Sequence, residues 1–69
     1  MTSYEFWRHG STGDIRAVKL RDGIVVACTG VLHRDDVDPD FLEALDYVEE
    51  GAAAIEATRD EYVLLTTGV

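Results

Sequence analysis

The chain has 69 residues, of which 46% are hydrophobic, and its 14 acidic and six basic side chains give a net charge of −8. A chain of this length buries only about 60% of its surface on folding, so we expect one domain over residues 1–69, with a small core and no deep catalytic cleft. The hydrophobic content excludes a disordered tail, and the acidic excess disfavours direct binding to nucleic acid or to an anionic membrane.

The acidic side chains are concentrated in one half of the sequence. Residues 1–33 hold three acids and four bases, whereas residues 34–69 hold eleven acids and two bases. This division predicts an acidic surface in the C-terminal half, which serves solubility or attracts a basic partner protein.

The number of cysteines and the lengths of the apolar segments indicate the cellular compartment of the protein. Cys28 is the only cysteine, so no intrachain disulfide can form, and a small domain without disulfides is typical of the cytoplasm. No apolar run approaches the roughly 18 residues of a membrane span, and the N-terminus lacks the layout of a signal peptide. We therefore expect a soluble cytoplasmic protein.

Three strands are predicted in the first half of the chain. Residues 4–9 alternate in polarity, and a glycine-rich turn follows them. Residues 15–21 and 24–29 are predicted as the next two strands, because Asp22-Gly23 between them is a strong signal for a two-residue hairpin turn.

The tight turn sets the register of this hairpin. From the turn outward, the predicted pairs are Arg21 with Ile24, Leu20 with Val25, Val18 with Ala27 and Arg16 with Thr29. One face then holds Val18, Leu20, Val25 and Ala27. The other holds Ile15, Ala17, Ile24, Val26 and Cys28. Both faces are largely apolar, so both must be covered.

Residues 39–60 carry a helical pattern that begins with Asp38 as N-cap and Pro39 at the first helical position. Apolar side chains recur at spacings of four and three, at Phe41, Leu45, Val48, Ala52 and Ile55. Gly51 interrupts this stripe, and the pattern favours one helix with a weak centre over two helices at 39–49 and 52–60. Residues 62–67 are predicted as a fourth strand, with a frayed helix end as the alternative.

The expected order is therefore β-β-β-α-β. This is an α+β domain: a small antiparallel sheet of three to four strands, with one amphipathic helix, continuous or broken at Gly51, packed on one face.

The acidic residues Asp36, Asp38 and Asp40 have the alternate spacing of a calcium loop. An EF-hand counted from Asp36 needs glycine at its sixth position and glutamate at its twelfth, where this chain has Phe41 and Tyr47. Helix capping explains these acids better than a calcium site does.

The remaining candidates for chemistry are Cys28, His9 and His33, which lack the close pairing of zinc ligands. A Cys28–His33 dyad has no third, orienting group, so a thiol enzyme is the weakest hypothesis. We predict no catalytic residue, no metal site and no cofactor.

The hypothesis that remains is a non-enzymatic protein–protein interaction module that forms a homodimer. One helix covers only one face of the hairpin, so the bare second face is expected to pack against a second copy, with residues 62–66 adding edge pairing. The candidate interface residues are Trp7, Ile15, Ile24, Val26, Tyr62 and Leu64. For Trp7, the only tryptophan, the sequence favours a core position, with an interface anchor as the alternative. The alternative is an acidic regulatory protein that mimics nucleic acid and occupies a basic partner.

Overall fold

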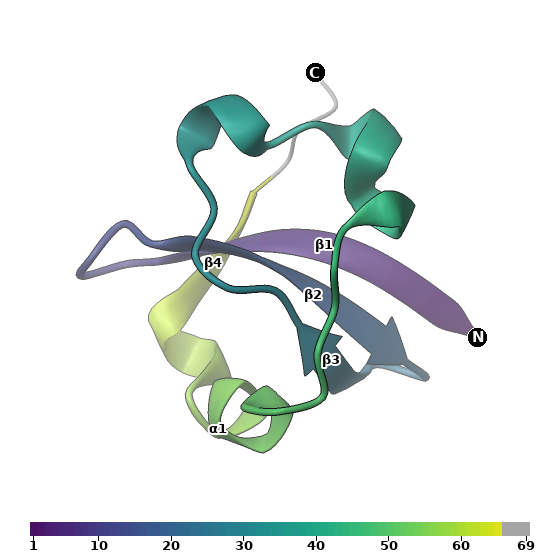
Figure 1. The fold of residues 1–69 in the computed structure, drawn as a ribbon. Helices are drawn as coiled ribbons and strands as arrows, with labels where there is room; N and C mark the ends of the chain where they lie inside the picture. The colour runs from purple at the N-terminus through teal and green to yellow at the C-terminus, as the bar shows by residue number, and fades with distance from the viewer. Residues whose placement is uncertain (66–69) are drawn as a thin grey trace.

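The computed structural model of the protein describes residues 1–65, which form one antiparallel sheet with short helical segments on both of its faces (Figure 1). The strands are β1 (Thr2–His9), β2 (Ile15–Arg21), β3 (Ile24–Cys28) and β4 (Tyr62–Leu65), in the order β3-β2-β1-β4. The predicted α+β class and the four predicted strands are confirmed. Positions 66 and 67 of the last predicted strand lie outside the described residues.

The turn between β2 and β3 is the predicted two-residue turn. Asp22 has a φ of 54° and Gly23 a φ of 83°, so both central residues are left-handed, as a type I′ turn requires. Arg21 pairs with Ile24 directly across the turn.

We expect Gly23→Val to destabilise the protein by about 1–3 kcal/mol, because a β-branched residue is strained at this φ. The matched control is Gly30→Val: Gly30 has no left-handed φ, and its added Cβ would meet no atom within 4 Å. Urea denaturation of both variants measures the difference. Equal stability of the two variants would contradict the assignment of the turn.

The register of this hairpin departs from the prediction beyond the first two pairs. Ala27 lies opposite Lys19 and Cys28 opposite Val18, instead of Ala27 opposite Val18. The reason is a β-bulge in which Val26 has no partner on β2, a feature that adds one residue to one strand. Past the bulge the side chains change face, so Cys28 packs with Val18.

The same shift corrects the last predicted pair, Arg16 with Thr29. Thr29 bonds to Ala17 instead: its N–H donates to the Ala17 carbonyl at 2.9 Å, and its hydroxyl accepts from the Ala17 N–H at 3.0 Å. Thr29 is buried with both of these bonds made.

Short helical segments replace the continuous helix predicted over residues 39–60. They are the 3-10 helices η1 (Arg34–Asp36), η2 (Pro39–Ala44) and η3 (Arg59–Glu61), and one α-helix, α1 (Ala52–Ala57). The predicted helix start is confirmed at η2, where an Asp38 carboxylate oxygen accepts from the Asp40 N–H at 3.0 Å. None of the helices in the described part of the chain is long and apolar enough to cross a membrane.

The continuous helix is wrong for two physical reasons. Gly51 has a φ of 88°, which no residue inside an α-helix adopts, so the break at Gly51 is present. Val48 lies in extended chain, where its N–H and carbonyl bond to the carbonyl and N–H of Cys28 on β3, both at 3.0 Å. This contact holds the segment before Gly51 along the sheet edge.

Both faces of the sheet are covered within the chain, by different segments (Figure 1). α1 covers one face, and we call the cluster beneath it the helix-side core: Trp7, Val18, Leu20, Val25, Cys28, Ala52 and Ile55. Residues 32–47 cover the other face, and we call the buried residues beneath them the loop-side core: Phe6, Ile15 and Ala17. Leu65 of β4 packs against this core from within the sheet. The expectation of a bare second face is therefore wrong.

Leu45 covers the loop-side core from the end of η2 and is half-buried there. We expect Leu45→Ala to cost about 1–3 kcal/mol, below the range of a fully buried leucine, because part of its side chain already contacts water. Phe41→Ala is the control, since Phe41 belongs to the same predicted stripe but is 61% exposed. Urea denaturation should show a clear loss for Leu45→Ala only, and a reversed order would contradict this packing.

Candidate functional site

The three candidates for chemistry lie in different parts of the structure: Cys28 in the helix-side core, His9 at the end of β1 and His33 in the lining of a surface groove. The Cys28 thiol is buried in the helix-side core and donates to the Glu50 carbonyl at 3.9 Å. The His9 Nδ1 accepts from the N–H groups of Ser11 and Thr12, at 3.1 and 3.3 Å, and so fixes the turn after β1. Among residues 1–65, no group of three or more His, Cys, Asp or Glu side chains could hold a metal ion.

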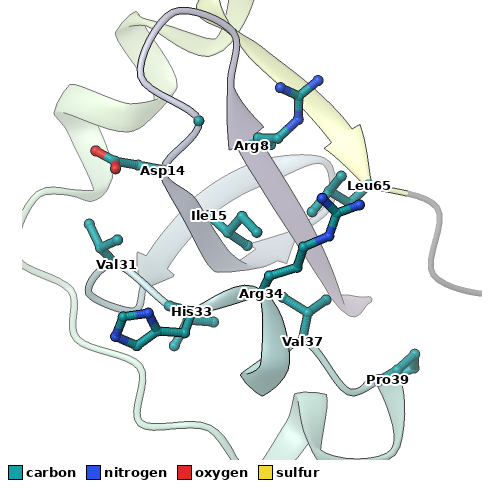
Figure 2. A pocket seen from close by; sticks show the side chains of 11 residues that line it. Arg8, Asp14, Ile15, Val31, His33, Arg34, Val37, Pro39 and Leu65 are labelled. Carbon is teal, nitrogen blue, oxygen red and sulfur yellow. The ribbon is translucent and has the colours of Figure 1, made fainter.

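A groove opens beside the loop-side core, between the sheet and residues 31–39 (Figure 2). Its volume is about 980 Å³, and its lining includes Ile15, Val37 and Leu65 together with two arginines, Arg8 and Arg34. The arginines come from β1 and η1, so the fold brings together two cations far apart in the sequence. The groove is open to solvent and combines an apolar lining with a positively charged side.

The two edges of the sheet differ in how their main-chain groups are bonded. At the β3 edge, the Val25 N–H donates to a Glu56 carboxylate oxygen at 3.1 Å, and Cys28 exchanges two hydrogen bonds with Val48. Glu56 reaches the edge from α1. The β3 edge is therefore closed by a side chain and by a neighbouring segment.

The β4 edge is open in the part of the chain that the structure describes. β4 pairs with β1 on one side, and no main-chain group of residues 1–65 pairs with its other side. Its exposed side chains are apolar: Val63 is 48% and Leu64 52% exposed. An apolar edge strand without proline or lysine is a template for pairing with another strand.

The direction of the main-chain groups of β4 follows from one hydrogen bond. The Gly10 N–H donates to the Glu61 carbonyl at 2.9 Å, which makes Gly10 and Glu61 a hydrogen-bonded pair. Because such pairs alternate along antiparallel strands, Arg8–Val63 is the next one, and Leu64 directs its N–H and carbonyl away from β1.

Tyr62 lies two residues before Leu64 on β4, so its main-chain groups also point away from β1 and its carbonyl is at the open edge. Its N–H is already bonded to the Arg59 carbonyl at the end of η3. The open edge therefore offers one donor, Leu64 N–H, and two acceptors, the Tyr62 and Leu64 carbonyls.

The six predicted interface residues are divided by the structure. Trp7, at 3% exposure, and Ile15, at 7%, belong to the two cores. Ile24 and Val26 lie on β3, Ile24 exposed and Val26 half-buried. Tyr62 and Leu64 lie on the open edge, where Leu64 pairs with Trp7 across the strands, and the Trp7 and Tyr62 rings are 6.0 Å apart.

Sequence reasoning missed three features of these surfaces. Val63 was inside a predicted strand, but its exposure depends on β4 being the last strand of the sheet. Glu56 lies off the apolar stripe of the predicted helix, so its sequence position gives no sign that its carboxylate reaches the Val25 N–H. The meeting of Arg8 and Arg34 needed the fold itself, because no local pattern relates two residues so far apart.

The acidic surface predicted for the C-terminal half lies on residues 35–50, which hold eight acids and no lysine or arginine. Seven of these acids are exposed, and Asp38 is half-buried. They are arranged on 3-10 turns and extended chain rather than along a helix.

Tyr47 is the titratable group on this segment that its surroundings clearly perturb. Burial, followed by the effects of Tyr4 and Glu43, raises its pKa from 10.0 to about 12. Its hydroxyl donates to the Leu42 carbonyl at 2.6 Å, and its ring lies 5.3 Å from that of Tyr4.

This raised pKa predicts a loss of stability in alkaline solution. Since the folded protein holds the phenol proton more tightly than the unfolded chain does, the contribution is complete below pH 10.0 and is lost as the pH rises towards about 12. Urea denaturation across this interval should show a steeper decline for the wild type than for Tyr47→Phe. Parallel declines would contradict the prediction.

These surfaces define a small α+β domain with one closed sheet edge, one open sheet edge and a cationic groove. Comparison of the chain with models of protein families, with curated proteins and with solved structures found no match.

Proposed function

We propose that the protein is a non-enzymatic interaction module of the cytoplasm, which self-associates by pairing β4 with β4 of a second copy. The observation that carries this proposal is the difference between the two edges: β3 is closed by Glu56 and Val48, whereas β4 is open and apolar over residues 62–65. Strand addition is a common way for proteins to bind through main-chain hydrogen bonds.

The main-chain groups of β4 suit a two-fold antiparallel pairing centred on Val63. In this register, the Leu64 N–H of each copy donates to the Tyr62 carbonyl of the partner subunit, which gives two equivalent hydrogen bonds. Val63 faces Val63 of the partner subunit at a non-hydrogen-bonded position, where side chains approach most closely. Self-complementarity of this kind is what a two-fold dimer requires.

The side chains support the same pairing. On the helix side of the sheet, Leu64 of one copy would pack against Tyr62 of the partner subunit, extending the layer that already contains Trp7. On the loop side, the two Val63 side chains would cover each other. Each copy carries a net charge of −8, so we expect association to strengthen as salt is raised, because screening acts over about 8 Å at physiological ionic strength.

Sedimentation equilibrium tests the proposal. We expect a reversible monomer–dimer equilibrium in the wild type and a monomer in Leu64→Lys, whose charge at the pairing edge opposes strand addition. The matched control is Ile24→Lys: Ile24 is 60% exposed on the closed strand β3, so this variant should dimerise like the wild type. A monomeric wild type at all concentrations, or equal dimerisation of both variants, would overturn the proposal.

A second candidate function rests on residues 35–50, whose eight acids have no base among them. This surface would occupy a basic partner, such as a DNA-binding protein, in the place of phosphates. Tagged wild type and the variant Asp46→Lys, Glu49→Lys, Glu50→Lys should then differ in pull-downs from the source organism. Recovery of a DNA-binding protein by the wild type alone would favour this function, and equal recovery by both would argue against it.

A further inference from the structure

Arg8 and Arg34 are the feature that the proposed function leaves unexplained. The chain has 14 acids and six bases, and yet neither arginine has an ion pair or a side-chain hydrogen bond among residues 1–65. Arg59 pairs with Glu56 at 3.3 Å, and Arg16 donates to the Thr29 carbonyl at 3.2 Å. Lys19 and Arg21 also make no such contact among residues 1–65, but they do not line the groove. Within residues 1–65, no hydrogen bond uses the five N–H donors of either guanidinium at the groove.

The arrangement of charge within the groove is one-sided (Figure 2). Both guanidinium groups lie on the side of Leu65, whereas the Asp14 carboxylate lies on the opposite side of Ile15 and points away from them. Asp35 and Asp36 follow Arg34 in sequence but do not line the groove. An anion on the Leu65 side would meet two cations and no lining carboxylate.

The surface next to the two arginines is apolar. Ile15 forms its floor, and Val37 and Leu65 flank it, both half-buried against the loop-side core. A small inorganic anion would leave this surface in contact with water. A ligand with an apolar chain beside its anionic group would use both parts of the groove.

The main-chain groups on the groove wall favour a small molecule over an extended peptide. The Leu32 N–H already donates to the Ile15 carbonyl at 2.7 Å, and the Val37 N–H to the Arg34 carbonyl at 3.3 Å. A peptide strand would need such groups as partners, whereas a carboxylate needs only the two guanidinium forks. The volume of about 980 Å³ lies within the range of small-molecule sites.

We propose that this groove binds a small amphipathic carboxylate, with its carboxylate between Arg8 and Arg34 and its apolar chain over Ile15, Val37 and Leu65. The two arginines supply forked, charge-assisted hydrogen bonds, and the apolar side chains exclude water from the ligand chain. This site lies on the loop side of the sheet and does not depend on pairing of β4.

Titration of ¹⁵N-labelled protein with octanoate, followed by heteronuclear NMR, tests the proposal. We expect amide shifts that saturate around Arg8, Ile15, Val37 and Leu65 and leave α1 unchanged. Octylammonium has the same chain and the opposite charge, so it should not bind. Acetate has the charge without the chain, so it should bind more weakly than octanoate.

Single variants test the two cations. Arg8→Gln and Arg34→Gln should each weaken octanoate binding by roughly tenfold or more, because each removes a charged hydrogen-bond partner. Arg21→Gln is the control, since Arg21 is exposed at the far end of β2 and does not line the groove. The NMR spectrum of each variant also shows whether it is folded.

Four results would overturn the proposal: no saturable shifts with octanoate, shifts outside the groove, equal binding of octylammonium, or equal affinity of the Arg8→Gln, Arg34→Gln and Arg21→Gln variants. An acetylated tripeptide ending in leucine that binds more tightly than octanoate would overturn the choice of a small molecule. A monomeric protein that still binds octanoate would support this site while refuting the pairing of β4.

Discussion

Phe6→Ala should leave the protein largely unfolded or only marginally stable. The Phe6 side chain is 2% exposed in the loop-side core, on a strand that is paired on both sides, with Ala17 and with Leu65. Removing a buried phenylalanine ring costs about 3–5 kcal/mol. A domain this small has a total stability near the lower end of the usual range of about 5–15 kcal/mol.

Chemical denaturation measures this loss, and Phe41→Ala is the matched control. Both variants delete the same ring, but Phe41 is 61% exposed, so its loss should change the free energy of unfolding by less than about 0.5 kcal/mol. If Phe6→Ala does not fold at all, Phe6→Leu keeps most of the volume and should give a measurable intermediate loss. Similar stabilities of Phe6→Ala and Phe41→Ala would mean that the loop-side core is not where we place it.

Val63→Cys should form a disulfide-linked dimer under mild oxidation, in a background where Cys28 is replaced by alanine. The proposed register puts Val63 directly opposite Val63 of the partner subunit at a non-hydrogen-bonded position, where Cα atoms lie about 4.5 Å apart. This separation is within the range that a disulfide spans. Non-reducing gel electrophoresis reports the linked species, and we expect it to be the main product at concentrations where the wild type is dimeric.

Two further cysteine positions separate the register from chance collisions. Ile24→Cys is exposed on β3 and should give little linked dimer, because that edge is closed. Leu64→Cys should link less well than Val63→Cys, since Leu64 faces Tyr62 of the partner subunit. Preferential linkage through position 64 would move the two-fold axis by one residue, and linkage equal to that of Ile24→Cys would contradict pairing of β4.

The strands could be predicted from the sequence because their signals are local. Asp22-Gly23 defines its own turn, and the alternating and β-branched residues around it have few other conformations available. The N-cap at Asp38 could also be predicted, because it depends on a side chain and an N–H two residues apart.

The bulge and the missing helix could not be predicted, because long-range contacts decide them. Val26 looks like any other strand residue, and only the pairing of Cys28 with both Val18 and Val48 makes it the unpaired one. The apolar spacing of residues 39–55 suits a helix, but three of the five side chains in the stripe, Phe41, Leu45 and Val48, pack on the loop side or face water once Val48 joins the sheet edge. Tertiary contacts outweigh a helical pattern that Gly51 already weakens.

The same limit applies to the candidate sites. Tyr62 and Leu64 could be chosen from the sequence because they sit in an apolar terminal strand. For Trp7 the sequence favours a core position over an interface anchor, and it places Ile15 on the face expected to be bare. Only the cover provided by α1 and by residues 32–47 assigns both residues to the cores. The positive charge of the groove depends on Arg8 and Arg34 lining it together, and no rule of sequence spacing predicts that these two residues meet.

The carboxylate of Glu56 on the Val25 N–H also limits the size of any assembly. A sheet with two exposed edges can add copies at both ends and grow into an open fibre, whereas a sheet with one exposed edge stops once that edge is used. If β4 pairs as proposed, the closed β3 edge leaves no second edge for strand addition, and pairing ends at two copies. Glu56, from the six-residue helix α1, and Val48 would together keep the proposed assembly from growing into a fibre.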